Sequence, residues 1–186
     1  MKPDIQIILQ PFFITARRQQ LWPLDDYAED VGKRLCPADA VEAALATGRP
    51  AEEAPLRCLA ETARSGGVAA ACLINGRAEM LWGVRRKGLL TSEGEIWMLR
   101  TQEPEKYPLR FARESRRHLA SMVNLSELTS FENIVHVENA AAIRWLQWLG
   151  FTFDRHVGTD WLHFTATDHE LLARNLKEEA DHGSGC

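Results

Sequence analysis

The stretch Val137-Glu-Asn-Ala-Ala-Ala-Ile-Arg-Trp-Leu-Gln-Trp-Leu-Gly-Phe-Thr-Phe153 decides how this chain folds. Asn139 stands where a helix is expected to begin, and Asn is among the residues preferred at helix N-caps. About three turns of almost wholly apolar helix follow. Gly150 stands at their end, where the left-handed exit conformation favours glycine. With a strand leading in and another from Phe151, the segment predicts a strand–helix–strand crossover.

Length and composition limit the class of protein. The chain has 186 residues, of which 45% are hydrophobic and 26% charged, and a formal net charge of -4. We expect one domain with a substantial core, spanning 1–186. The negative charge gives no general attraction to nucleic acid or to an anionic membrane. The apolar runs are too short to span a bilayer, and the first residues do not resemble a signal peptide.

Hydrophobic periodicity divides the chain into a largely helical part (1–66), a sheet core (67–165), and a C-terminal helix and tail (166–186). Predicted helices cover 24–33, 37–46, 51–64, 108–123 and a last segment from the Thr167 capping box to about 180. Predicted strands cover 5–9, 12–17, 68–74, 77–84, 96–101, 131–137, 151–154 and 161–165.

Two of the strand predictions define the sheet. Asn75-Gly76 separates two apolar runs and supplies the two positive φ angles of a type I′ hairpin turn. The run 96–101 is apolar on both faces, which is typical of a central strand covered on both sides. The sequence therefore predicts an α/β fold: a mixed, mostly antiparallel twisted sheet with helices on both faces and a helical N-terminal half.

The crossover segment resembles the last conserved block of the GNAT N-acetyltransferases, N-x-x-A-x-x-x-Y-x-x-x-G-F. Asn139, Ala142, Gly150 and Phe151 match this block, and Leu146 stands where the family most often has Tyr. From about 68 to 165 the order of predicted elements also resembles the GNAT core. The resemblance implies a GNAT-like fold.

The chain also resembles the small internal virion proteins of short-tailed phages, a divergent GNAT-like family. The residues that carry this likeness lie in 109–117, 134–146 and 163–165. It implies a non-catalytic virion or head-associated protein that acts in particle assembly through protein–protein contacts. Its partners would be other virion proteins or further copies of itself, its location the virion or host cytoplasm, and membrane or nucleic-acid partners are not expected.

The residues that would bind and use acetyl-CoA support the non-catalytic interpretation. GNAT enzymes cradle the diphosphate with a glycine-containing loop before a helix, but the segment 101–111 has no glycine, two prolines and two glutamates. The Tyr that protonates the departing thiolate is replaced by Leu146. Tyr107 is expected at the wrong end of the preceding helix. The prediction is therefore that no cofactor is bound.

The alternative is a GNAT acyl-CoA-dependent N-acetyltransferase that uses acetyl-CoA. Lys106, Arg110, Arg113 and Asn139 would then bind the cofactor, and Glu95 is a weak candidate for the catalytic base. Each also has a structural explanation: a solvated basic helix face, a helix cap, and an exposed carboxylate at a strand end. A sensor that binds a small ligand in a vestigial cleft is the third possibility.

Metal and partner sites follow from the remaining motifs. The six histidines show no paired ligand spacing, and no metal site is expected. The four cysteines share no metal-like spacing; Cys36, Cys58 and Cys72 are expected as buried thiols in a reducing cytoplasm, and Cys186 ends a Gly-Ser-Gly tail that is expected to be flexible. Trp145 and Trp148 lie on the mostly apolar helix and are the candidate interface residues. Their alternative role is to fill the core.

Overall fold

The computed structural model describes residues 3–11, 24–88 and 90–173. Seven strands form one sheet in the order β1-β2-β3-β4-β5-β7-β6, and only β4 and β5 are paired in parallel. The strands are β1 (Ile5–Pro11), β2 (Val68–Ile74), β3 (Arg77–Arg86), β4 (Glu93–Arg100), β5 (Ser130–His136), β6 (Thr152–Val157) and β7 (Trp161–Thr167). This mixed, mostly antiparallel sheet with helices confirms the predicted fold class.

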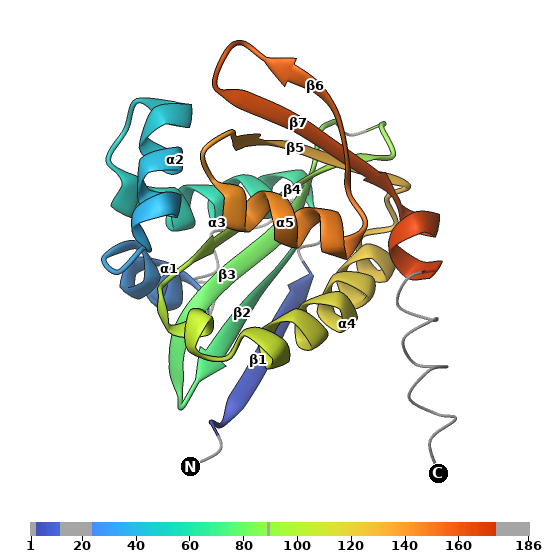
Figure 1. The fold of residues 1–186 in the computed structure, drawn as a ribbon. Helices are drawn as coiled ribbons and strands as arrows, with labels where there is room; N and C mark the ends of the chain where they lie inside the picture. The colour runs from blue at the N-terminus through green and yellow to red at the C-terminus, as the bar shows by residue number, and fades with distance from the viewer. Residues whose placement is uncertain (1–2, 12–23, 89, 174–186) are drawn as a thin grey trace.

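Helices cover both faces of the sheet (Figure 1). They are α1 (Asp25–Gly32), α2 (Pro37–Thr47), α3 (Ala54–Ser65), α4 (Pro108–Ser126) and α5 (Ala140–Leu149), with short 3-10 turns η1 (Ala51–Glu53) and η2 (Glu103–Lys106). The helices α1 and α3 pack on one face, while α4 and α5 pack on the other. None of the described helices is long and apolar enough to cross a membrane.

The β2–β3 hairpin turn and the two ends of α5 form as their sequences predict. Asn75 and Gly76 adopt φ angles of 53° and 80°, so the β2–β3 hairpin turns as expected. The Asn139 side chain accepts a hydrogen bond from the amide of Ala142 and caps α5. Gly150 ends that helix at φ 118°, a conformation that residues with a Cβ rarely adopt.

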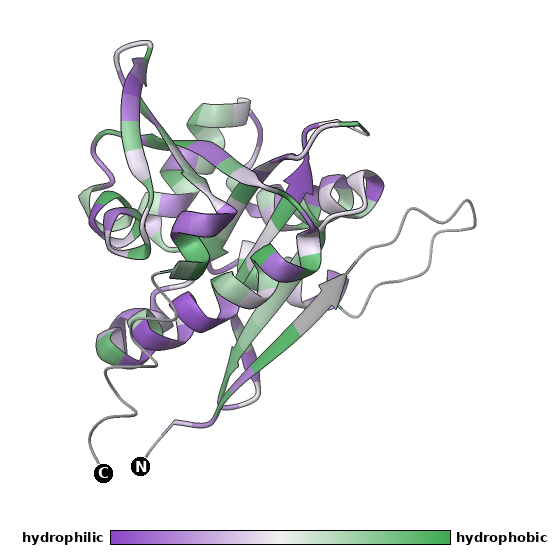
Figure 2. Ribbon diagram, turned by 90° about the vertical axis from the view of Figure 1, so that its right-hand side faces the viewer, coloured by the Kyte–Doolittle hydropathy of each residue, from purple (hydrophilic) through white to green (hydrophobic). Residues whose placement is uncertain are grey.

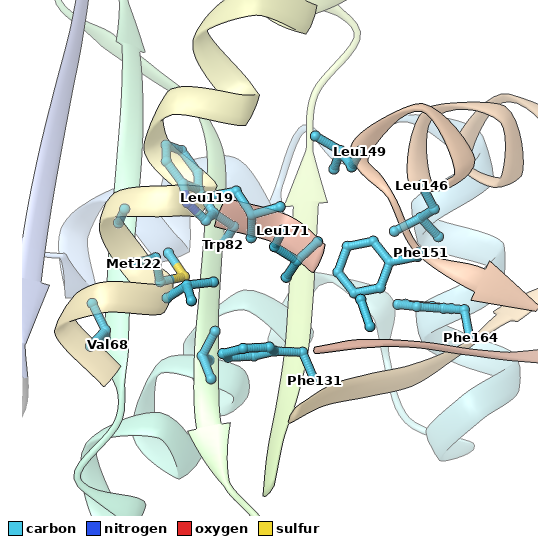
Figure 3. Packing of buried hydrophobic residues seen from close by; sticks show 14 of the residues in the cluster. Val68, Trp82, Leu119, Met122, Phe131, Leu146, Leu149, Phe151, Phe164 and Leu171 are labelled. Atoms are coloured by element: carbon cyan, nitrogen blue, oxygen red, sulfur yellow. The ribbon is translucent and has the colours of Figure 1, made fainter. Parts of the chain in front are cut away.

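The larger core lies between the sheet and the α4–α5 face. Phe131 is completely buried and lies beneath α4 with Val68 of β2, facing Leu119 and Met122 of that helix, as Figure 3 shows. Burying a large apolar side chain stabilises the fold by about 1.5–3 kcal/mol. Coloured by hydropathy, the central strands are mostly apolar, while the helices alternate apolar and polar residues along their turns (Figure 2). The sheet is therefore covered on both sides, as its apolar strands require.

Several predicted boundaries differ from the structure. The strand β4 begins at Glu93, three residues before its first apolar side chain, because backbone pairing with β3 continues through Gly94 and Glu95. The helix α4 extends to Ser126. The predicted strand 12–17 lies outside the described residues. The capping box is confirmed, since Thr167 and Glu170 exchange side-chain to backbone hydrogen bonds, but the predicted end of that helix also lies outside the described residues.

Candidate active site

The sheet opens between its two parallel strands. Pairing of β4 with β5 covers only three residues and ends at Glu95 and Glu132. Beyond this point the Asn133 side chain lies between the strands: its Nδ2 donates to the Ile96 carbonyl at 2.6 Å, and its Oδ1 accepts from the Ile134 amide at 2.7 Å. These bonds satisfy backbone groups that a continued ladder would have paired, so the strands can separate at little cost.

The separated edge of β4 carries backbone groups that face the opening. Arg100 uses its amide and carbonyl on this side, toward Asp39 and Cys36, and Ile96 uses its carbonyl toward Asn133. Alternate residues of a strand direct their peptide groups to the same edge. The N–H and C=O of Met98, which lies between them, therefore point into the opening, beyond the end of the β4–β5 pairing.

A cavity of about 440 Å³ occupies this opening. It passes through the sheet and is lined from both faces. On the α4 side the walls are mostly apolar. On the α2–α3 side they include four carboxylates and two guanidinium groups, which are Asp39, Glu42, Glu61, Glu95, Arg57 and Arg85. This volume lies in the range of small-molecule sites, and the polar wall carries an excess of negative charge.

The helix α2 lies across the ends of both separated strands. Its Asp39 carboxylate accepts a hydrogen bond from the Arg100 amide at 2.8 Å, at the end of β4. One turn later, Glu42 accepts from the His136 amide at 2.9 Å and from the Asn139 Nδ2 at 2.7 Å, at the end of β5. Two carboxylates on one helix face thus hold α2 to the two sides of the opening.

Burial changes the proton affinity of both carboxylates. Loss of hydration is the largest effect on Glu42 and raises its pKa above the ordinary glutamate value, although the hydrogen bonds from Asn139 and His136 oppose it. Burial likewise raises the pKa of Asp39, against the opposing charge of Arg100. A carboxylate with a raised pKa is a stronger base than an exposed one. Glu42 therefore has the environment of a general base, facing the cavity.

The thiols on this cavity are poor nucleophiles. Cys72 and Cys58 both line it, and burial raises the pKa of Cys72 to about 12 and raises that of Cys58 as well. Burial also raises the pKa of Cys36, which lies beside Asp39, to about 11. The thiolate, not the thiol, is the reactive form. This environment favours direct attack by a substrate over a cysteine-bound intermediate.

Glu95, the base candidate chosen from sequence, also lines the cavity. Its carboxylate forms an ion pair with Arg85, which also pairs with Glu61 of α3. Two carboxylates thus share one guanidinium. Glu95 is placed where a substrate would reach it, and its catalytic role stays a prediction.

The four residues predicted to bind the cofactor are divided by the structure. Arg110 and Asn139 line the cavity, and Arg110 donates to the Pro3 carbonyl at 2.8 Å. Lys106 and Arg113 lie outside it on the surface. Lys106 pairs with Glu103 at 2.6 Å, and Arg113 has most of its side chain exposed. Their roles in binding stay predictions.

The two candidate interface residues both make contacts within the chain. Trp145 lines the cavity, stacks on Phe111 with centroids 5.6 Å apart, and donates from its Nε1 to Ser115 at 3.2 Å. The guanidinium of Arg116 lies 3.6 Å from the Trp148 ring centroid. Cation–π contacts of this kind stabilise partly exposed aromatic rings. An interface role for either tryptophan stays a prediction.

The connection from β4 to α4 does not offer a backbone cradle for a diphosphate. The amides of Glu103, Glu105 and Tyr107 already donate within the chain, to Thr101 Oγ1 and to backbone carbonyls. Pro104 and Pro108 have no amide hydrogen. From Glu103 to Pro108, successive unpaired N–H groups, which a diphosphate nest requires, are thus not available.

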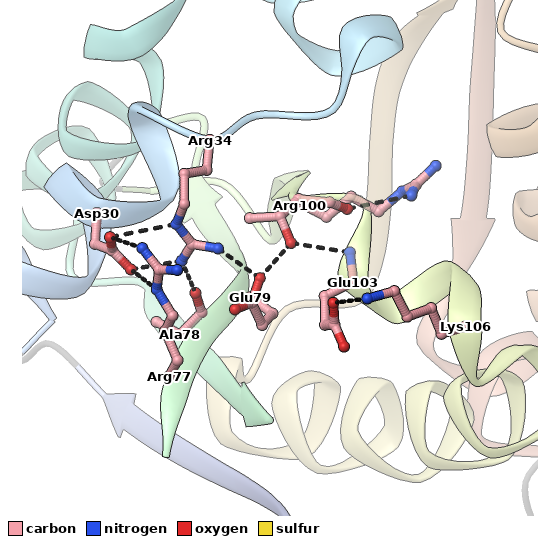
Figure 4. A network of polar contacts seen from close by, with 9 residues as sticks. Asp30, Arg34, Arg77, Ala78, Glu79, Arg100, Glu103 and Lys106 are labelled. Carbon is pink, nitrogen blue, oxygen red and sulfur yellow. Dashed lines mark hydrogen bonds and ion pairs between the residues drawn. The ribbon is translucent and has the colours of Figure 1, made fainter. Parts of the chain in front are cut away.

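Buried polar contacts fix this connection in place (Figure 4). The Thr101 hydroxyl bonds to Glu79, and Glu79 also pairs with Arg34 at 2.7 Å. Arg34 in turn pairs with Asp30 at 2.5 Å, and the hydrogen bonds from Arg77 and then Arg34 lower the pKa of Asp30. The turn is held by β3 and α1. Any contact with donor phosphates would therefore come from the first turn of α4 rather than from this turn.

Sequence reasoning missed two residues of the cavity wall. Tyr107 was expected at the wrong end of its helix, but it lines the cavity and brings a phenol to it. Glu42 was not singled out. The signal was present: Asp39 and Glu42 are three residues apart and are the only charged residues of α2. Leu146, the residue in place of the family's Tyr, does line the cavity.

The fold is that of the GNAT acetyltransferases. The chain is similar to the GNAT domain of S. lividans PAT, with 13% identity, a TM-score of 0.63, and coverage of 86% of this chain and 89% of that one. It is similar to spermidine N-acetyltransferase from Vibrio cholerae in complex with CoA and spermine, with 13% identity, a TM-score of 0.61, and coverage of 90% and 98%. No protein-family model and no curated protein matches the sequence.

These similarities correct two of the predictions. The prediction of a non-catalytic phage virion protein is wrong, because the similar structures are acetyltransferases and nothing in the comparison supports the phage family. The prediction that no cofactor is bound is also contradicted, since one of these structures is a complex with CoA. Loss of the diphosphate loop does not entail loss of the whole site. The opening between β4 and β5 depends on backbone geometry, which that loop does not determine.

Proposed function

We propose that this protein is an acyl-CoA-dependent N-acyltransferase that transfers an acyl group from a thioester to an amine. The observation that carries the proposal is the opening between β4 and β5, where the Met98 peptide groups face a cavity of about 440 Å³. A thioester arm rich in amide groups can hydrogen-bond to such a strand edge in the manner of an added strand. The acyl donor would thus lie between the two strands.

The polar wall on the α2–α3 side suits an amine acceptor. Its four carboxylates outnumber its two guanidinium groups, which favours a cationic amine at this end. The similar V. cholerae enzyme was crystallised with spermine, a polyamine. An acceptor entering here would meet Glu42, whose raised pKa suits removal of the proton that an amine loses as it attacks.

The chemistry follows from this arrangement. The neutral amine attacks the thioester carbonyl carbon, the C–N bond forms, the C–S bond breaks, and the products are an amide and free thiol. Glu42 takes the proton that the amine loses. Tyr107 is the phenol on the cavity wall and is our choice for the group that gives a proton to the departing sulfur.

Side chains must do what the missing diphosphate nest does not. Arg110 on the cavity wall and Arg113 one turn further along α4 are the cations placed to contact donor phosphates. Charge-assisted hydrogen bonds from arginine to phosphate are among the stronger polar contacts in proteins.

The test combines turnover with binding. Thiol release from acetyl-CoA and longer acyl-CoA thioesters is measured with a panel of primary amines, including polyamines, and CoA binding is measured by calorimetry. We expect amine-dependent thiol release and micromolar CoA binding that the double variant Arg110→Glu with Arg113→Glu abolishes. Arg64→Glu, on the last turn of α3, is the control. Absence of both binding and turnover would refute the proposal.

A further inference from the structure

The wall of the cavity beneath α4 is chemically unlike the wall near α2. The strands β1, β2 and β3 contribute Ile5, Ile7, Cys72, Ile74, Met80 and Trp82 to it. All six belong to the core on the α4 face of the sheet or pack against it. The carboxylates Glu61 and Glu95, by contrast, lie on the α3 side, where both pair with Arg85. The cavity therefore has a branch with an apolar floor of strand side chains and a polar branch. Above that floor, α4 contributes polar groups as well as apolar ones, namely Arg110, Glu114, Ser115 and His118.

The apolar branch is shielded from solvent. Cys72, Ile74, Met80 and Trp82 are each exposed by 8% or less, although they line the cavity. Cavities walled by apolar side chains hold water poorly and bind small apolar molecules instead. Leaving such space unfilled costs stability, since each cubic ångström of cavity costs about 24 cal/mol. A ligand that fills the branch recovers these lost contacts.

The two branches meet at the opening between β4 and β5. Met98 and Ile96 line the cavity at that point, and Glu42 faces it from α2. A thioester bound at the strand edge would therefore lie between the two branches. Its amine partner would occupy the polar branch, and the apolar branch would lie on the opposite side of the thioester. Only the acyl chain of the donor is available to fill that branch.

We infer that the group transferred is a medium-length hydrocarbon acyl chain, longer than acetyl, seated between the sheet and α4. This inference rests on the proposed function and specifies its donor. Phe111, Leu119 and Trp145 complete the apolar surroundings from the helices. Each additional methylene buried there should raise kcat/KM by about fourfold until the branch is filled.

A chain-length series tests the inference. With one amine held constant, kcat/KM is measured for acetyl-, butyryl-, hexanoyl- and octanoyl-CoA. Calorimetric titration without amine gives the affinity of each donor and its heat-capacity change. We expect butyryl- or hexanoyl-CoA to exceed acetyl-CoA in both kcat/KM and affinity. The heat-capacity change of binding should become more negative with chain length, as burial of apolar surface requires.

A variant that fills the branch locates the effect. Cys72→Phe places a larger side chain on its floor and should remove the gain with chain length, measured as the ratio of kcat/KM for hexanoyl-CoA to that for acetyl-CoA. Leu125→Phe, half-exposed near the far end of α4, is the matched control and should keep the gain. Ile7→Phe makes the same test from the edge strand if Cys72→Phe does not fold.

The outcomes separate this inference from the proposed function. Acetyl-CoA turning over at least as well as every longer donor overturns the inference and leaves the proposed function standing. The same holds if Cys72→Phe and Ile7→Phe fold normally but keep the full gain with chain length. Failure of every donor to bind or to react with any amine refutes the proposed function, and the inference with it.

Discussion

Glu42→Gln is the substitution that tests the proposed chemistry most directly. The carboxylate accepts hydrogen bonds from the His136 amide at 2.9 Å and from the Asn139 Nδ2 at 2.7 Å. Glutamine has one acceptor oxygen, and its NH2 group must face one of these donors. Asn139 cannot turn its own oxygen toward Glu42 without losing the bond from Ala142 that caps α5.

The cost to stability follows from this count. One of two buried hydrogen bonds is lost, which costs about 1–3 kcal/mol, and removal of a buried charge offsets part of it. We expect a net loss of about 1–2 kcal/mol in the free energy of unfolding. A protein with the usual stability of about 5–15 kcal/mol stays almost wholly folded after such a loss.

The expected effect on catalysis is much larger. Removing a general base lowers the rate by about 10²–10⁴-fold. In the native protein, kcat/KM should fall as the pH drops through the raised pKa of Glu42, because the base becomes protonated. The variant should lack this dependence. Because the pKa of Glu42 is raised in the folded state, the native protein loses stability as the pH rises through that pKa. The difference in free energy of unfolding between the native protein and Glu42→Gln should therefore become smaller as the pH rises through the same range.

The assay is thiol release as a function of pH, with thermal unfolding measured on the same samples. Glu53→Gln makes the same chemical change at an exposed carboxylate and should alter neither measurement. A Glu42→Gln protein that keeps its rate within threefold, and keeps the acidic limb of the pH profile, would refute the assignment of Glu42 as the base.

Three further predictions concern the fold. Phe131→Ala should lower the free energy of unfolding by about 3–5 kcal/mol in chemical denaturation, because the ring is completely buried; a loss below 1 kcal/mol would contradict that packing. Gly150→Ala should cost about 1–3 kcal/mol because φ is 118°, whereas Gly88→Ala, where an added Cβ meets nothing closer than 3.6 Å, should be neutral; equal effects in thermal unfolding would count against this explanation. The hydrogen bond from His163 lowers the pKa of Asp154, so its stabilisation is present above the ordinary aspartate pKa of 3.8 and is lost as the pH falls toward the lowered value. Asp154→Asn should flatten the acid side of the melting temperature profile, and an unchanged slope would exclude this pair as its source.

The parts of the fold that could be predicted are those that local sequence determines. Asn139 and Gly150 mark the ends of α5 because capping depends on the residue itself and its immediate neighbours. Asn75 and Gly76 mark a hairpin because few other residues accept two positive φ angles in succession. These signals require no knowledge of which strands become neighbours.

The site was harder to predict because its residues come together only through the topology. Glu42 accepts hydrogen bonds from His136 at the end of β5 and from Asn139 at the start of α5, which lie 94 and 97 residues further along the chain. Arg85 of β3 forms an ion pair with Glu95 on the neighbouring strand and a second ion pair with Glu61 of α3. Tyr107 turns into the cavity because the connection before α4 is held by buried polar contacts. None of these relations has a signature in local spacing.

The error in predicting function has a physical cause that bears on the proposal itself. The prediction from sequence relied on a glycine-containing loop and a tyrosine, both of which are short motifs in the sequence. The opening that would hold a thioester is made instead by backbone: β4 and β5 separate after Glu95 because Asn133 satisfies the Ile96 carbonyl in place of a continued ladder. A binding edge of this kind tolerates many side chains, since its donors and acceptors are peptide groups. If the proposed function is correct, loss of the diphosphate nest removes one part of donor recognition, and the larger share of the affinity would come from the thioester arm and from the apolar branch beneath α4.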